Sequence, residues 1–183
     1  MQNIYMPQQL SISEICQLLD KNFTTFAAQV ANTPDTQFEL NPNGKWSVGQ
    51  HLQHLIQSVA PVNQALYLPK FVLGWTFGKA NRPSKTYPEL VQKYSEKLAN
   101  GAVATARFVP KPIFLPQKAK LLLQYEGHKN RLIKHLQAFS ESDLDTYIAP
   151  HPLLGKITLR ELMYFTMYHT EHHFSILLRE NES

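Results

Sequence analysis

The alternation of apolar and polar positions predicts four long helices joined by irregular connections. Within each predicted helix, apolar residues recur every three to four positions, which is the spacing of one buried helix face. The helices are expected at about residues 10–31, 47–66, 116–139 and from 158 onward. Three of them begin with the pairing typical of a capping box, namely Ser11 with Glu14, Ser47 with Gln50 and Thr158 with Glu161. Pro61 lies inside the second helix and predicts a bend rather than an end.

The connections are rich in proline and glycine. Residues Leu73–Pro88 are predicted to form a long loop, and a short helix is expected from about Pro88 to Leu98. A proline-punctuated stretch follows, and residues 151–155 predict a turn before the last helix. Period-two alternation of β-branched residues is nearly absent, so we expect no sheet. The predicted fold class is all-α, a single domain over residues 1–183 that forms a four-helix bundle with one additional short helix and long loops.

Composition and charge exclude several classes of protein. The chain has 183 residues, of which 43% are hydrophobic and 17% charged, as in a folded globular domain rather than a disordered chain. The net charge of +4 comes from scattered lysines and arginines, which gives little support for nucleic-acid binding. Cys16 is the only cysteine, so neither an intramolecular disulfide nor a multi-thiolate metal site can form. With no membrane-length apolar run and no secretory signal pattern, a cytoplasmic protein is expected.

The most informative chemical feature is a histidine pair in the last predicted helix. His169 and His173 are four residues apart and fall within the apolar stripe of that helix. Two imidazoles one turn apart are what a metal ion needs from one helix, although buried histidines satisfied by hydrogen bonds would give the same pattern. A metal site needs a third ligand, and the second helix contains both His51 and His54. His51 borders the apolar stripe, whereas His54 lies on a small-residue face that a bundle can also bury, so periodicity leaves both open.

Four further residues are candidates for acid–base chemistry only because they are close to these histidines in the sequence. His172 lies on the flank of the apolar stripe, and Glu171 points away from His169 and His173. His151, in the turn before Pro152, could line a pocket. His51 completes the set, and no general acid or base stands out among the four.

Three motifs together resemble the DinB-like superfamily of four-helix bundles, which includes the YfiT type of metal-dependent hydrolase. They are the segment Trp46-Ser-Val-Gly-Gln-His-Leu-Gln-His54, the dipeptide His151-Pro, and His169-x-x-x-His173. In that family three histidines bind a divalent metal, often nickel or zinc. The resemblance therefore implies His54, His169 and His173 as ligands and selects His54 over His51. His51 stands where such proteins usually have an apolar residue, and this departure suggests that it supports the ligands from outside.

The resemblance also implies a class of reaction. Some members of the superfamily transfer low-molecular-weight thiols such as bacillithiol or mycothiol, and others are described as hydrolases. We therefore expect a metal-dependent hydrolase or thiol transferase that acts on a small-molecule substrate, and a homodimer is also implied. The alternative is a non-catalytic bundle that binds a small molecule or a protein and contains a structural metal. No function of the family maps onto residues 73–116.

Overall fold

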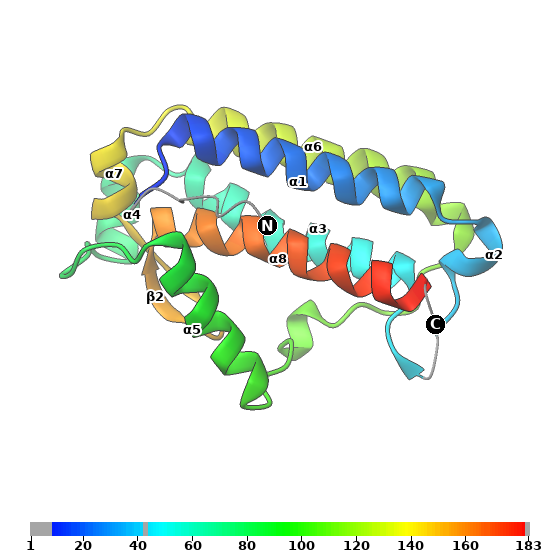
Figure 1. Cartoon of the computed structure of the whole chain (residues 1–183). Coiled ribbons are helices and arrows are strands. Elements are labelled where there is room, and N and C mark those ends of the chain that lie inside the picture. Colours follow the sequence, from blue (N-terminus) through cyan, green and yellow to red (C-terminus); the bar gives the residue numbers. More distant parts are fainter. Residues whose placement is uncertain (1–8, 42–43, 182–183) are drawn as a thin grey trace, which may run out of the picture.

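Four long helices form a bundle in the computed structural model, which describes residues 9–41 and 44–181 (Figure 1). These helices are α1 (Ile12–Asn32), α3 (Val48–Tyr67), α6 (Lys118–Leu136) and α8 (Leu159–Asn181). Around the bundle, α3 packs on α6, α6 on α1, α1 on α8 and α8 on α3. Figure 1 shows that α1 and α8 run in one direction and α3 and α6 in the other. The predicted all-helical bundle is therefore confirmed.

The predicted capping boxes explain where three of the long helices begin. The Ser11 and Ser47 hydroxyls accept hydrogen bonds from the main-chain N–H three residues later. In turn, the side chains of Glu14 and Gln50 accept hydrogen bonds from the main-chain N–H groups of Ser11 and Ser47. Thr158 and Glu161 make the same reciprocal pair at the start of α8. Such pairs satisfy main-chain donors that a helix start leaves without partners. As expected, α3 continues through Pro61.

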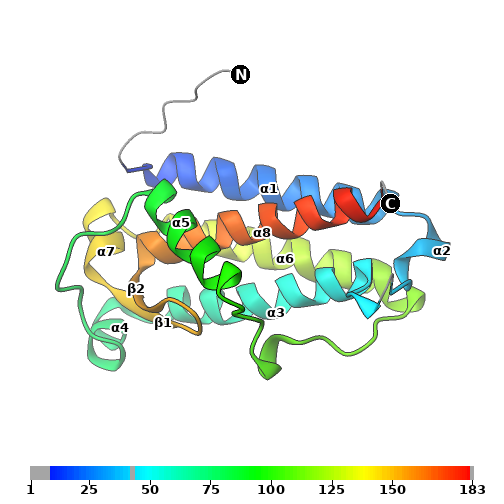
Figure 2. The same cartoon turned by 60° about the horizontal axis from the view of Figure 1, so that its bottom comes forward.

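A long crossover joins α3 to α6, because α3 ends and α6 begins at opposite ends of the bundle (Figure 2). It contains α4 (Lys70–Thr76), α5 (Tyr87–Ala99) and the 3₁₀ turns η2 (Ala106–Phe108) and η3 (Leu115–Gln117). The short helix predicted at 88–98 is confirmed as α5, which packs on α8. The loop predicted at 73–88 is wrong at its start, where α4 is helical. There Leu73 is buried, and Gly74 permits close packing against the Tyr147 ring.

A β-hairpin is the main departure from the predicted secondary structure. Strands β1 (Ile148–His151) and β2 (Gly155–Thr158) are antiparallel, and the predicted turn at 151–155 forms the end of this hairpin. Four-residue strands are too short for their alternation to stand out in the sequence. Gly155 has φ of 75°, a conformation that L side chains rarely adopt.

The boundaries of other elements also differ from prediction. The short helices α2 (Asp35–Phe38) and α7 (Glu141–Thr146) were not predicted, although Ser140 and Asp143 form a capping box before α7. The helix predicted at 116–139 begins later, at Lys118, because Pro116 lies in the η3 turn.

The described helices include none that combines the length and the hydrophobicity needed to cross a bilayer. The expectation that the chain carries no secretory signal concerns residues 1–8, which lie outside the described residues.

Candidate metal centre

Three histidine side chains from two helices converge in the middle of the bundle. His54 belongs to α3, whereas His169 and His173 lie one turn apart on α8. The Nε2 atom of His169 is 3.1 Å from the Nε2 of His54 and 3.1 Å from the Nε2 of His173. All three side chains are buried, and together they form a group that could hold a metal ion.

The spacing of these nitrogens fits a shared cation. Imidazole nitrogens bind zinc at about 2.0–2.1 Å, which puts two ligand nitrogens about 2.9–3.4 Å apart for angles between a right angle and a tetrahedral one. The two Nε2–Nε2 separations of 3.1 Å fall inside that range. Both separations that involve His169 therefore suit a shared ion, and the ligand atoms of all three histidines lie within 4.8 Å of one another.

Hydrogen bonds at the Nδ1 atoms of His54 and His173 determine which ring nitrogens of these side chains carry protons. The Nδ1 of His54 lies 2.7 Å from the carbonyl oxygen of Phe108, which can only accept, so Nδ1–H donates and the Nε2 of neutral His54 is a bare acceptor. The Nδ1 of His173 lies 2.8 Å from the Nδ1 of His51, and one proton lies between them. When His173 donates this proton, its Nε2 is bare as well. A single Nε2–H on His169 could then satisfy only one of its two neighbours, whereas a cation would use all three lone pairs.

The surroundings keep the three imidazoles neutral. Burial lowers the pKa of His54 below its ordinary value of 6.5. Burial, reinforced by the neighbouring histidines, lowers the pKa of His169 and of His173 much further. Because a metal binds the deprotonated imidazole nitrogen, these side chains are ready for binding without first losing a proton.

The comparison with protein families agrees with this geometry. A family model described as the DinB superfamily matches residues 18–177. The chain belongs to the DinB superfamily. This membership confirms the resemblance inferred from the three motifs. No curated protein sequence matches the chain.

In this DinB-superfamily protein the three histidines line a large open cavity. Its volume is about 1100 Å³, and its walls come from α3, α5, α8, the β-hairpin and the stretch around η2. Trp46 also lines it, with its ring centroid 4.9 Å from that of His54. The crossover, to which no function could be assigned from the sequence, therefore supplies one wall of the candidate site.

Two of the four acid–base candidates face this cavity. His172 is half-buried and lines it beside His173. His151, at the end of β1, also lines it, as the sequence suggested. The Nδ1 of His151 accepts hydrogen bonds from the main-chain N–H groups of Leu153 and Leu154, so the proton of the neutral ring is on Nε2. Burial lowers the pKa of His151 to about 4, which keeps it a neutral hydrogen-bond donor at pH 7.

The other two candidates do not line the cavity. His51 is buried behind His173, and burial lowers its pKa to about 4. The Glu171 carboxylate accepts hydrogen bonds from Asn22 on α1 and from the Tyr87 hydroxyl on α5. Glu171 therefore ties three helices together, and its orientation away from the histidine pair agrees with the helical periodicity.

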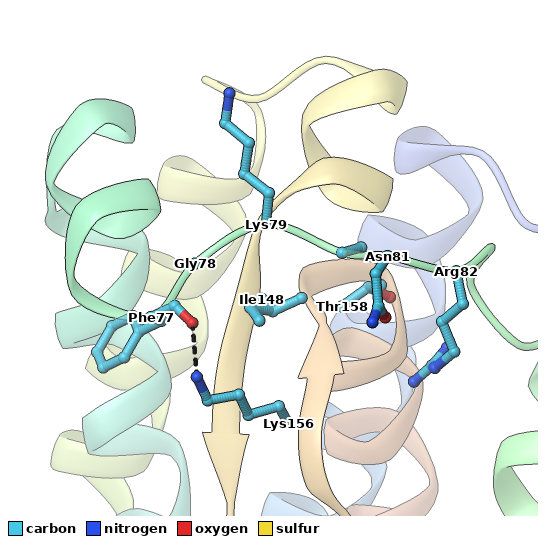
Figure 3. A pocket seen from close by; sticks show the side chains of 9 residues that line it. Phe77, Gly78, Lys79, Asn81, Arg82, Ile148, Lys156 and Thr158 are labelled. Atoms are coloured by element: carbon cyan, nitrogen blue, oxygen red, sulfur yellow. Dashed lines mark hydrogen bonds between the residues drawn. The ribbon is translucent and has the colours of Figure 1, made fainter.

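A second pocket, of about 370 Å³, lies between the β-hairpin and residues 77–82 (Figure 3). Two of its three cationic side chains already make hydrogen bonds, and the third points away from the pocket lining. Arg82 donates two hydrogen bonds to Glu161, and the Lys156 ammonium donates to the Phe77 carbonyl. Figure 3 shows Lys79 extending away from the other labelled side chains. This pocket contains no grouping comparable to the three histidines.

Sequence reasoning missed several residues of the site. Phe108 acts on His54 through its main-chain carbonyl, and no residue-type signal predicts such a contact. Tyr94 and Arg107 line the cavity from α5 and η2. The amphipathic pattern of α5 could have indicated that Tyr94 faces inward, but it could not show which helix α5 meets.

Proposed function

We propose that this protein is a metal-dependent enzyme in which His54, His169 and His173 bind one divalent cation, with nickel or zinc the expected metal. The convergence of their three Nε2 atoms at the wall of a cavity carries this proposal. The metal, when bound, supplies Lewis acidity that lowers the pKa of a water molecule or a small thiol toward neutrality. The proposed activity is therefore hydrolysis or thiol transfer on a small molecule.

The side chains around the cluster have separate roles in this proposal. The carbonyl of Phe108 orients His54, and His51 orients His173, so that both present Nε2 to the same point. Trp46 packs beside the rings of His54 and His173 and limits the access of water from that side. His151 presents its Nε2–H toward a substrate and can stabilise charge that develops there.

One observation favours a catalytic centre over a structural metal. Structural zinc sites are closed by four protein ligands, whereas catalytic sites have three and leave a position open. Among the described residues, the group that could hold a metal consists of three histidines, and all three line the cavity. An open coordination position that faces the cavity would let water or a substrate reach the metal. A catalytic site needs such a position, whereas a structural site has none.

The proposal is tested by measuring bound metal by mass spectrometry after reconstitution with nickel, zinc or manganese. We expect about one equivalent in the wild type and little in His54→Ala, His169→Ala and His173→Ala. His135→Ala is the matched control, because His135 is a half-buried histidine on α6 outside the cluster. Stoichiometric metal in all three variants, or a wild type that binds none of the three metals, would refute the assignment.

A further inference from the structure

The cavity beside the three histidines is walled mainly by apolar side chains. They come from several elements and include Val62, Leu68, Leu98, Phe108, Leu153 and Phe165. A molecule that entered with many hydroxyl or amide groups would lose hydrogen bonds to water and find few replacements on these walls. The walls therefore favour a ligand with an apolar body.

The lining of the cavity contains few charged side chains. Among the described residues that line it there is no aspartate or glutamate, and Arg107 in η2 is the only arginine or lysine. Arg107 is exposed, and its guanidinium lies over the Phe108 ring at 5.7 Å from the centroid. It forms no ion pair with another described residue. A cation at the exposed edge of an apolar cavity suits a ligand with one acidic group.

We propose that the cavity takes an amphiphilic small molecule with a hydrocarbon or aryl body and a single acidic group. The apolar body lies among α3, α5 and the β-hairpin, and the acidic group pairs with Arg107. This inference rests on the proposed function, since it names the class of substrate that would be brought to the metal centre. In a thiol-transfer reaction, this molecule would be the acceptor rather than the polar thiol.

Straight-chain carboxylates from butyrate to dodecanoate are suitable probes. Trp46 lines the cavity and Trp75 is exposed on α4, so a Trp75→Phe background leaves Trp46 as the only tryptophan and its fluorescence as the readout. Affinity should rise about fourfold with each added methylene until the chain fills the cavity. Primary alcohols of equal length should bind about threefold more weakly, because they cannot pair with Arg107.

Paired variants separate the two parts of the proposal. Ala65→Phe, which fills the cavity from α3, should weaken dodecanoate binding at least about tenfold. Ala28→Phe, on an exposed site of α1, should leave it unchanged. If Ala65→Phe does not fold, Ala104→Phe fills the cavity from the crossover. Arg107→Gln should abolish the difference between carboxylates and alcohols, whereas Arg131→Gln, on the exposed face of α6, should preserve it.

The titrations are made on metal-loaded wild type and on the His169→Ala variant, and the metal content is measured separately. Affinity that does not depend on chain length, or that Ala65→Phe leaves unchanged, would overturn the inference even if the protein binds metal. Equal carboxylate and alcohol affinities in the wild type would overturn the role of Arg107. Chain-length dependence in a wild type that binds no metal would support the ligand class while contradicting the proposed metal-dependent function.

Discussion

The Nδ1 atoms of His51 and His173 lie 2.8 Å apart in the interior of the bundle. His51 does not line the cavity, and it contacts the site through the rings of His173 and Trp46. When His51 accepts the proton that the two Nδ1 atoms share, it fixes the orientation of the His173 ring and leaves the Nε2 of His173 free to bind a cation. We therefore propose that His51 is a positioning residue rather than a catalytic one.

The first prediction concerns this pair. His51→Leu should weaken metal binding about 10–100-fold, because partners of this kind hold a ligand in its binding orientation. His51→Gln keeps an acceptor oxygen and should recover part of the affinity. Competition against a chromophoric chelator measures both variants. Equal affinities in the wild type and His51→Leu would refute the positioning role, and matching unfolding temperatures of the metal-free proteins would exclude a general loss of structure.

The second prediction concerns removal of the metal. An ion held by His54 on α3 and by His169 and His173 on α8 binds the folded chain only, so at a hundred times its dissociation constant it adds about 2.7 kcal/mol of stability. For a chain of this size that corresponds to a Tm higher by about 5–10 °C. Calorimetry with and without a chelator measures the shift. His169→Ala should melt at the same temperature under both conditions, and a similar chelator effect on this variant would place the metal elsewhere.

The third prediction concerns Gly49, near the start of α3. A Cβ atom there would come within 2.9 Å of both Phe38 and Ile113, which are buried. Gly49→Ala should therefore lower the free energy of unfolding by about 1–3 kcal/mol, despite the better helix propensity of alanine. Gly127→Ala in α6 meets only the guanidinium of Arg131 at 3.8 Å and should be neutral or stabilising by up to about 1 kcal/mol. Urea denaturation compares the two variants, and equal effects would contradict the packing argument.

The fourth prediction concerns Glu161, whose buried carboxylate joins the crossover to α8. Burial alone would raise its pKa, but hydrogen bonds from Arg82 and from the main-chain N–H groups of Lys85 and Thr158 hold the pKa below the ordinary value of 4.5. Its stabilising effect is therefore complete above about pH 4.5 and is lost as the pH falls through the lowered pKa.

Glu161→Gln should accordingly lower the free energy of unfolding by about 1–2 kcal/mol at pH 7, because it removes the carboxylate that pairs with Arg82, whose side chain is 35% exposed and stays partly hydrated. The difference from the wild type should shrink as the pH falls well below 4.5. Denaturation at both pH values tests this. Glu126→Gln, in a partly exposed ion pair with Lys129, should cost less than about 1 kcal/mol at pH 7. A Glu161→Gln deficit that does not change with pH would show that the ion pair is not its cause.

The helices were predictable because their signals are local. Apolar spacing and the three capping boxes depend on residues within a few positions of one another, and they located α1, α3 and α8 closely. The hairpin was missed because its four-residue strands are too short for their alternation to stand out, and α4 was missed because its formation depends on distant partners. Leu73 is buried in the core, and Gly74 lies against Tyr147, which follows α7 far along the chain.

The sequence by itself determined the bundle and the helical histidine pair of His169 and His173, while its periodicity left both His51 and His54 open and only the family resemblance selected His54. Tertiary structure decided the rest. Each bundle helix has two neighbours, so two faces of α3 are buried, and only the placement of α3 against α8 brings His54 rather than His51 within 3.1 Å of the Nε2 of His169. The Phe108 carbonyl and the apolar walls come from the crossover, which folds back along the bundle. Side-chain patterns record which face of a helix is buried, whereas main-chain contacts and the relative positions of helices arise only when the whole chain packs.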